Sequence, residues 1–363
     1  MKRIVALFLV LTLAFSCSKQ DNRVHSKRTH RDIPVITEIP PSPDEPRDLD
    51  MVKTPLTIRT RCENTTFQIL SQLSGLTVWT WSIDGGVTWN ELDWQYDSSN
   101  YLYVAEFILP NAGTKLLLKG NSGTTKGCQI NFDKSAFVYG NVMSLIYWDD
   151  FESRTTLTES YCFEELFFYC EQLVNHPFYD IVLPATQLTE GAYSAMFEYC
   201  ESMERAPDLP ATNAPSKCYE SMFEGCKSLV KVPSVLSAES LGTRSYADMF
   251  YGCSSLKEAP EIKAKSLSMA SLLGMFGYCE LLEIAPAINV SYIPNDGMYF
   301  MFLGCTNLKY IECMATSFGN SYSTKMFTKN AGQGKGTFVK AASMTSWPIG
   351  EDGIPVGWTV VNK

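Results

Sequence analysis

The chain has few of the residues and motifs that mark common enzymes. It contains three histidines among 363 residues, and only His176 lies outside the Pro-rich segment near the N-terminus. The Gly-x-Ser-x-Gly, His-Glu-x-x-His and phosphate-loop motifs are missing. No Cys-x-x-Cys pair suggests a zinc site. The sequence therefore predicts a protein that is not an enzyme and that uses no cofactor and no metal.

The chain also lacks an excess of positive charge and long apolar runs. Its 30 Lys and Arg against 39 Asp and Glu give a net charge of -9. Nucleic-acid grooves need clustered Lys and Arg, so we expect no nucleic-acid partner. After residue 17 no stretch reaches the roughly 18 apolar residues that a membrane-spanning helix needs. The mature protein is therefore predicted not to cross a membrane.

Residues 1–17 have the pattern of an export signal. Lys2 and Arg3 precede a short apolar stretch that closes on Ser16-Cys17. The segment resembles a bacterial lipoprotein signal, which is cut before a cysteine that then carries lipid. This resemblance implies lipidation at Cys17 and a lipid-anchored position on the outer membrane, at the cell surface. An ordinary secretory signal with an incidental cysteine is the alternative.

Residues 18–50 are predicted to form a disordered, Pro-rich tether. The segment has few apolar residues to bury, so it cannot offset the entropy lost on ordering. Its prolines stand among Ser, Asp, Glu and Arg: Pro34, Pro40, Pro41, Pro43 and Pro46. Such an arm would hold the folded part away from the membrane surface.

Residues 51–147 alternate apolar and polar residues over short runs that are separated by turns rich in Gly, Asn, Ser and Asp. The runs are Leu56–Ile58, Phe67–Leu70, Leu76–Trp81, Tyr101–Ile108 and Lys115–Lys119. Several strands at this spacing predict a small antiparallel β-sandwich of immunoglobulin-like size.

One turn in this region has a recognisable sequence. Residues 82–89 resemble an Asp-box, a hairpin turn in which the carboxylate of Asp84 accepts N–H bonds and Trp89 packs beneath the turn. A propeller enzyme would carry one copy in each blade, whereas this chain has a single copy, which indicates a structural role. As an alternative function, Trp81, Trp89 and Trp94 could form an aromatic platform that binds sugar rings.

A second region repeats variants of Met-Phe-x-Gly-Cys-x-Ser-Leu. The repeat cysteines are Cys170, Cys200, Cys226, Cys253, Cys279 and Cys305, so successive differences in their numbers are 30, 26, 27, 26 and 26. A fixed period in this range indicates stacked repeats. In the third copy, Tyr219, Met222, Phe223 and Cys226 have helical spacing, and a short Pro-ended run follows. The pattern predicts a short helix plus a short parallel strand in each repeat.

The repeat motif resembles that of the BspA-like leucine-rich repeat proteins, a group that includes surface lipoproteins of Bacteroidetes. The shared elements are Phe-x-Gly-Cys-x-Ser-Leu and a Pro-ended strand, as in Ala206–Ala211. The resemblance implies an α+β fold in which the sandwich is followed by a leucine-rich-repeat solenoid over residues 148–330. Residues 331–363 are predicted to cap its open end. The family also implies adhesion to surface proteins or glycans of a host or of other bacteria.

The twelve cysteines of the chain do not follow a disulfide pattern. Because the six repeat cysteines share one repeat position, they are predicted to form an inward column of reduced thiols. Pairing of Cys62 with Cys128 in the sandwich remains open at this stage.

Binding residues are expected in the variable columns just after the repeat cysteines, since stacked repeats present a long regular surface. These columns lie four, five and eight residues after each cysteine. Their candidate binding residues are Glu204, Arg205, Asp208, Lys231, Lys257, Glu258, Glu261, Glu283, Lys309 and Tyr310. Three functions remain open: adhesion or ligand binding through these columns, glycan capture by the sandwich tryptophans, and a spacer without a ligand.

Overall fold

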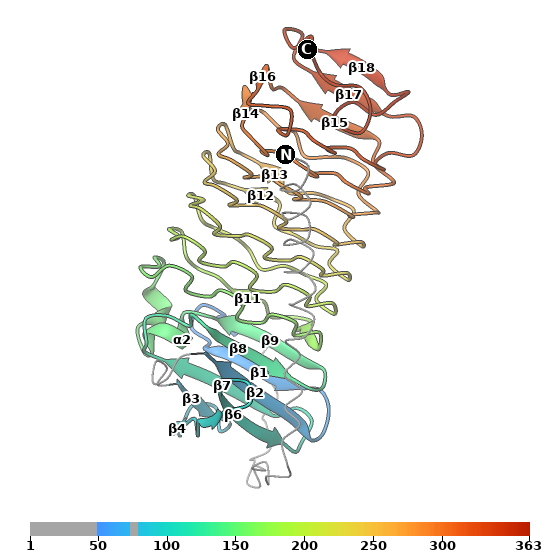
Figure 1. The fold of residues 1–363 in the computed structure, drawn as a ribbon. Coiled ribbons are helices and arrows are strands. Elements are labelled where there is room, and N and C mark those ends of the chain that lie inside the picture. The colour runs from blue at the N-terminus through green and yellow to red at the C-terminus, as the bar shows by residue number, and fades with distance from the viewer. Residues whose placement is uncertain (1–48, 73–78) are drawn as a thin grey trace.

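The computed structural model describes residues 49–72 and 79–363. The predicted signal (1–17), the lipidation site Cys17 and the tether up to residue 48 lie outside the described residues. So does part of the strand expected at Leu76–Trp81. The described chain is elongated, with two larger sheets at one end and a three-stranded sheet at the other (Figure 1).

The N-terminal end consists of a seven-stranded and a four-stranded sheet. The larger sheet has the order β10-β9-β1-β7-β3-β4, and β11 also pairs with β9. The smaller sheet has the order β5-β6-β2-β8. The strands are β1 (Leu56–Thr60), β2 (Thr65–Ser71), β3 (Trp79–Ser82), β4 (Asn90–Glu91), β5 (Gln95–Asp97), β6 (Leu102–Leu109), β7 (Lys115–Gly120), β8 (Cys128–Phe132) and β9 (Ala136–Asn141).

Alternation along these strands places apolar side chains between the sheets. In β2, every second residue is buried, and Phe67 and Ile69 are fully buried. Ile58 of β1 and Leu116 of β7 belong to the same core cluster. This core is continuous with that of the repeats.

The larger sheet leads directly into the repeats. Strand β9 pairs in parallel with β10 (Leu173–Asn175) and β11 (Ile181–Val182), which belong to the first repeat. The smaller sheet also touches this repeat, because the N–H of Ile130 in β8 donates to the carbonyl of Leu166 at 2.7 Å. The first repeat is therefore joined to both sheets by backbone hydrogen bonds.

The predicted α+β fold with a leucine-rich-repeat solenoid of helix plus strand is wrong. The helical segments of the described chain are α2 (Ser144–Tyr147) and the 3₁₀ turn η1 (Phe151–Ser153), and both precede the repeats. The repeats consist instead of consecutive turns joined by isolated bridges and, in some repeats, by very short strands, most of them in small separate sheets. These strands are β12 (Val235–Leu236), β13 (Glu261–Ile262), β14 (Tyr292–Ile293), β15 (Tyr310–Cys313) and β16 (Ser317–Phe318).

A left-handed residue at every fourth position prevents a helix in the repeats. Lys217, Ser221 and Gly225 have φ values of 59°, 54° and 71°, a region that a right-handed helix does not contain. As a result, backbone N–H groups alternate along the repeat between a carbonyl of the same turn and a carbonyl of the next repeat. The N–H of Met222 donates within its own turn to the carbonyl of Tyr219 at 3.2 Å, whereas that of Phe223 donates to Met249 of the next repeat at 2.9 Å. Four-residue turns and helices share a similar apolar spacing, which explains the wrong prediction.

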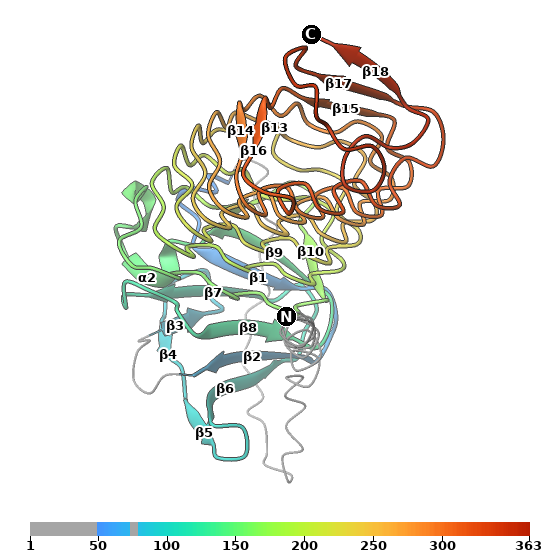
Figure 2. The same ribbon diagram turned by 45° about the horizontal axis from the view of Figure 1, so that its top comes forward.

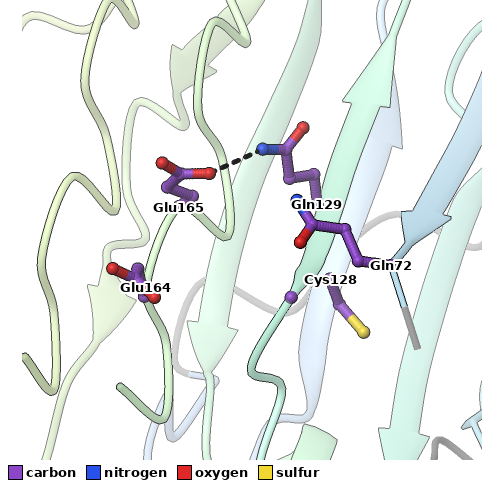
Figure 3. Close-up of a pocket in the computed structure, with 6 residues that line it drawn as sticks. Gln72, Cys128, Gln129, Glu164 and Glu165 are labelled. Atoms are coloured by element: carbon purple, nitrogen blue, oxygen red, sulfur yellow. Dashed lines mark hydrogen bonds between the residues drawn. The ribbon is translucent and has the colours of Figure 1, made fainter. Parts of the chain in front are cut away.

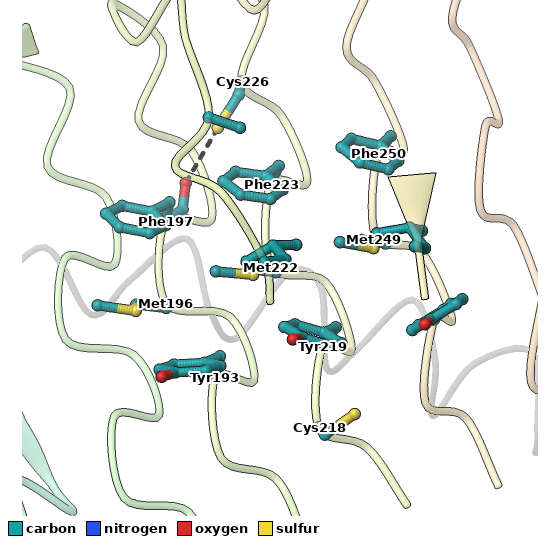
Figure 4. Close-up of a cluster of buried hydrophobic side chains, with 14 of the residues drawn as sticks. Tyr193, Met196, Phe197, Cys218, Tyr219, Met222, Phe223, Cys226, Met249 and Phe250 are labelled. Carbon is teal, nitrogen blue, oxygen red and sulfur yellow. Dashed lines mark hydrogen bonds between the residues drawn. The ribbon is translucent and has the colours of Figure 1, made fainter. Parts of the chain in front are cut away.

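The repeats stack in register, so equivalent side chains form buried columns (Figure 4). The rings at the Phe position lie nearly parallel, with centroid separations of 5.6, 5.7, 5.6, 5.6 and 5.9 Å from Phe167 through Phe197, Phe223, Phe250 and Phe276 to Phe302. All six of these side chains are fully buried. In the turned view, the backbone turns of successive repeats again lie one after another along the chain (Figure 2).

Proline limits the length of the repeat strands. Proline donates no N–H bond, so a strand cannot extend through it within a ladder. The repeats that contain Pro233 and Pro260 have strands of two residues, β12 and β13. The last repeat carries Glu312 at this position, and its strand β15 has four residues. Strand β15 pairs in parallel with β17 (Thr337–Lys340), which pairs in parallel with β18 (Thr359–Asn362).

Candidate functional site

The exposed columns after the repeat cysteines lie on a backbone ladder. Parallel bridges join Arg205 to Lys231, Glu258 to Ile284, and Ile284 to Tyr310. Position five after the cysteine is thus aligned between neighbouring repeats. The bridges align equivalent positions of neighbouring repeats, while the local conformation differs from the predicted helix and strand.

Most of the candidate binding residues reach solvent. Arg205 and Tyr310 are half-buried, and the others are exposed: Glu204, Asp208, Lys231, Lys257, Glu258, Glu261, Glu283 and Lys309. Two candidate residues lie eight residues after the repeat cysteine, beyond the position five residues after it where the bridges form. Asp208 lies in an irregular stretch, and Glu261 belongs to β13.

Opposite charges in neighbouring repeats pair with each other on this surface. Lys309 lies 2.9 Å from Glu283, and Arg205 lies 2.5 Å from Asp180. Glu261 pairs with Lys263 of the same repeat at 2.6 Å. Exposed pairs of this kind contribute about 0–1 kcal/mol each. The charges therefore do little to hold the repeats together, and they leave the surface with a mixed charge pattern.

The structure does not unite the three candidate tryptophans into one platform. Trp81 stacks on Phe107 at 5.3 Å, while the ring of Trp89 faces Trp148 at 6.0 Å. Trp94 is partly buried against the core cluster. Among the ring contacts of the described residues, none joins two of these three tryptophans. Packing accounts for each ring separately.

The Asp-box turn forms a closed hydrogen-bonded unit around Asp84. Its carboxylate accepts bonds from the Thr88 hydroxyl at 2.6 Å, from the Val87 N–H at 3.0 Å and from the Ser82 hydroxyl at 2.7 Å. The hydrogen bond from the Thr88 hydroxyl is the largest of the effects that hold the pKa of Asp84 well below its usual range. The indole N–H of Trp89 donates to the Gly86 carbonyl at 3.0 Å. All these groups satisfy one another within the turn.

The repeat cysteines lie in a buried column, as predicted. All six are fully buried, and none of them is in a disulfide. From the second repeat on, each thiol donates to a phenylalanine carbonyl of the preceding repeat: 3.2 Å for Cys200 to Phe167, 3.1 Å for Cys226 to Phe197, and 3.0 Å for Cys305 to Phe276. Burial raises the pKa of these thiols, so they remain protonated donors. Cys62, the open case in the sandwich, is a partly buried free thiol.

A charged group on the turn surface of the repeats was not anticipated. Arg244 donates to Glu220 at 2.7 Å and lies 3.5 Å from Asp248. Burial, followed by the neighbouring Glu224 carboxylate, raises the pKa of Asp248 to about 8, although Arg244 opposes this shift. The side chain of Asp248 is 21% exposed. Because the three residues occupy different repeat positions, the repeat pattern gave no sign of this group.

The Asp248→Asn substitution is expected to change how stability depends on pH. The folded-state pKa lies above the unfolded value of about 3.9, so the free energy of unfolding of the wild type falls as pH rises from about 4 to 8. An uncharged Asn removes this loss. Each pKa unit corresponds to about 1.4 kcal/mol, so the free energy of unfolding of the variant relative to the wild type should be several kcal/mol more favourable at pH 8 than at pH 4. Urea unfolding at both values measures it, and an equal difference at the two pH values would contradict the assignment.

A polar pocket of about 210 Å³ lies where the sheets meet the first repeat (Figure 3). Its lining residues are Gln72, Gly127, Cys128, Gln129, Glu164 and Glu165. The glutamines come from the sheet side and the glutamates from the repeat side. The amide of Gln129 donates to Glu165 at 3.1 Å. Burial, and next the Glu165 carboxylate, raises the pKa of Glu164, while Lys126 and Lys217 act in the opposite direction.

The sequence reasoning missed this pocket, because its residues come from three distant segments. The first repeat differs from the others in carrying Leu166 in place of Met, and this apolar exchange gives no sign of a polar pocket.

Residues 49–72 and 79–363 hold neither a candidate metal centre nor a candidate membrane-spanning helix. These residues contain no group of three or more His, Cys, Asp or Glu side chains that could hold a metal ion. No helix among them has the length and apolar character needed to cross a membrane. Comparison of the chain with models of protein families, with curated proteins and with solved structures gives no match.

Proposed function

We propose that the protein is a non-catalytic binding protein of the bacterial cell surface, lipid-anchored through Cys17. Its ligand would be a protein or glycan on the surface of a host or of another bacterium, held by the exposed columns. The observation that carries this proposal is the set of parallel bridges that join Arg205 to Lys231, and Glu258 through Ile284 to Tyr310. It presents different side chains at one fixed position in successive repeats.

The backbone beneath these columns favours binding. Every repeat is tied to its neighbours by backbone hydrogen bonds, such as that from the Ala206 N–H to the Lys231 carbonyl at 2.9 Å. A surface that is already ordered loses little conformational entropy on association. Ile284 and Val230 add apolar area among the charges, with exposed fractions of 62% and 54%. A mixed apolar and charged surface is typical of protein interfaces.

The likeness of the repeat motif to that of BspA-like surface proteins supports the surface location, as does the lipoprotein-like sequence ending at Cys17. Neither feature depends on a helix in the repeat. The proposal therefore rests on the motif and on the exposed columns, without the helix-plus-strand solenoid that the structure excludes.

Binding of the full chain to arrays of glycans and extracellular-matrix proteins tests the proposal. The double variant Lys231→Glu, Lys257→Glu reverses two charges within the columns. Lys53→Glu, Lys335→Glu makes the same charge change at exposed positions elsewhere. We expect at least a tenfold loss of binding in the first variant and an unchanged affinity in the second. Binding to no array member, or equal losses in both variants, would overturn the proposal.

A further inference from the structure

The three-stranded sheet at the far end of the repeats has an open edge. Its strands β15, β17 and β18 pair in parallel in that order, so β18 is the outermost strand (Figure 1). Among residues 49–72 and 79–363, none pairs with the outer side of β18. At the opposite end of the repeats, β9 covers the first repeat by pairing with β10 and β11. The described repeat region is therefore covered by a sheet at one end and presents a strand edge at the other.

Two residues of β18 direct their backbone groups toward this open edge. On the inner side, the N–H of Thr359 donates to the Gly336 carbonyl at 2.8 Å, and that of Lys363 donates to the Lys340 carbonyl at 2.9 Å. In a parallel ladder, the backbone groups of successive residues point alternately to the two sides of the strand. The N–H and C=O groups of Val360 and Asn362 therefore face outward. Such a row of donors and acceptors is a template for the backbone of another strand.

The side chains of β18 extend two buried rows that end in solvent. Val360 continues the row of Ile311 and Phe338, which are fully buried, but is itself 42% exposed. On the other face, Val361 follows Val339, and the exposed fraction rises from 3% to 40% between them. A strand placed beside β18 would cover both valines and continue both rows.

Strand β18 itself has the properties that this edge requires of a partner. Thr359–Asn362 contains three β-branched residues, which favour strands, and it lacks the Lys, charged residues and Pro that commonly protect an exposed edge. Its outward-facing residues, Val360 and Asn362, lie symmetrically on either side of Val361. Two antiparallel copies of β18 can therefore exchange four hydrogen bonds, with Val360 of each copy opposite Asn362 of the other. Val361 then lies opposite Val361 of the second copy, and no like charges are brought together.

We propose that β18 pairs in antiparallel orientation with β18 of a second copy of this chain, forming a two-fold symmetric dimer. The contact uses the same surface on both copies, so it closes on itself and does not propagate into a filament. Because the strand is short, the contact area is small and the association is weak and reversible. The dimer would present two sets of exposed columns in one particle. It goes beyond the binding function proposed above and does not depend on it.

Sedimentation equilibrium of the full chain over a range of protein concentrations tests the proposal. We expect a reversible equilibrium between monomer and dimer. Val361→Lys places two ammonium groups opposite each other and should weaken the association at least about tenfold. Val356→Lys makes the same charge change outside β18, at a residue that is 78% exposed, and should leave the association unchanged. Thermal melting checks that both variants are folded. A monomeric wild type, or equal association of the two variants, would overturn the proposal.

Cysteine variants test the register of the two strands. In the proposed pairing, the two Val361 Cα atoms form a non-hydrogen-bonded pair about 4.5 Å apart, which is within the range of a disulfide. The two copies of Thr359 are offset by four residues, or about 14 Å along the strands. Mild oxidation should therefore link Val361→Cys into a covalent dimer and leave Thr359→Cys at the background level of the wild type, whose described cysteines are buried or partly buried. Equal cross-linking of the two variants, or none in Val361→Cys, would contradict the proposed pairing.

Discussion

Replacement of Phe223 by Ala is expected to lower the free energy of unfolding by about 3–5 kcal/mol. The ring of Phe223 is fully buried and stacks on both neighbours in its column, at 5.7 Å from Phe197 and 5.6 Å from Phe250. The substitution would leave a cavity in the middle of the stack, where the backbone ladder prevents collapse from either side. Urea denaturation followed by tyrosine and tryptophan fluorescence measures the loss.

Phe178→Ala is the matched control for this prediction. Phe178 belongs to the same repeat region, but it is 72% exposed. Its truncation should change the free energy of unfolding by no more than about 0.5 kcal/mol. Similar losses in the two variants would show that the Phe column is not the core of the repeats.

Replacement of Cys226 by Ala is expected to lower the free energy of unfolding by about 2 kcal/mol. The Cys226 thiol is fully buried and donates to the Phe197 carbonyl at 3.1 Å. Truncation removes the buried sulfur and one of the hydrogen bonds to that carbonyl, and each loss contributes roughly 1 kcal/mol. The same urea measurement applies.

Cys62→Ala provides the comparison for the thiol column, since Cys62 is only partly buried and lies outside the repeats. We expect a loss of less than about 0.5 kcal/mol for that variant. If Cys226→Ala were as stable as the wild type, the thiol ladder would have no role in stability.

The sequence predicted the stacking and the buried columns of the repeat region but not its backbone. The regular recurrence of the cysteines requires equivalent positions to align, and their burial is confirmed. The local conformation depends on left-handed residues such as Ala195 and Ala270, with φ values of 51° and 54°. Alanine does not favour that region on its own. Hydrogen bonds to the next repeat, such as that from the Ala195 N–H to the Glu220 carbonyl, impose the left-handed conformation. The spacing of apolar residues in the sequence does not reveal these hydrogen bonds.

The two parts of the candidate site differ in how far sequence could lead to them. The exposed columns follow from the repeat period, because bridges such as Arg205 to Lys231 join residues one period apart. The polar pocket beside the first repeat needs Gln72, Gln129 and Glu165 to meet across about 90 residues of chain. Because these residues are far apart in the sequence, no local sequence pattern predicts their contact. Trp81, Trp89 and Trp94 show the reverse case: they are close in sequence, but the structure does not bring them into one shared surface.

Thiol labelling during unfolding tests the central claim most directly, namely that the repeats form one cooperative stack around a column of buried thiols. Pulses of iodoacetamide at increasing urea concentration, read by mass spectrometry of peptides, report each repeat cysteine separately. We expect the six repeat cysteines to be unreactive in the native protein and to become reactive together in one transition: Cys170, Cys200, Cys226, Cys253, Cys279 and Cys305. Native reactivity of any of the six, or a disulfide between two of them, would contradict the account.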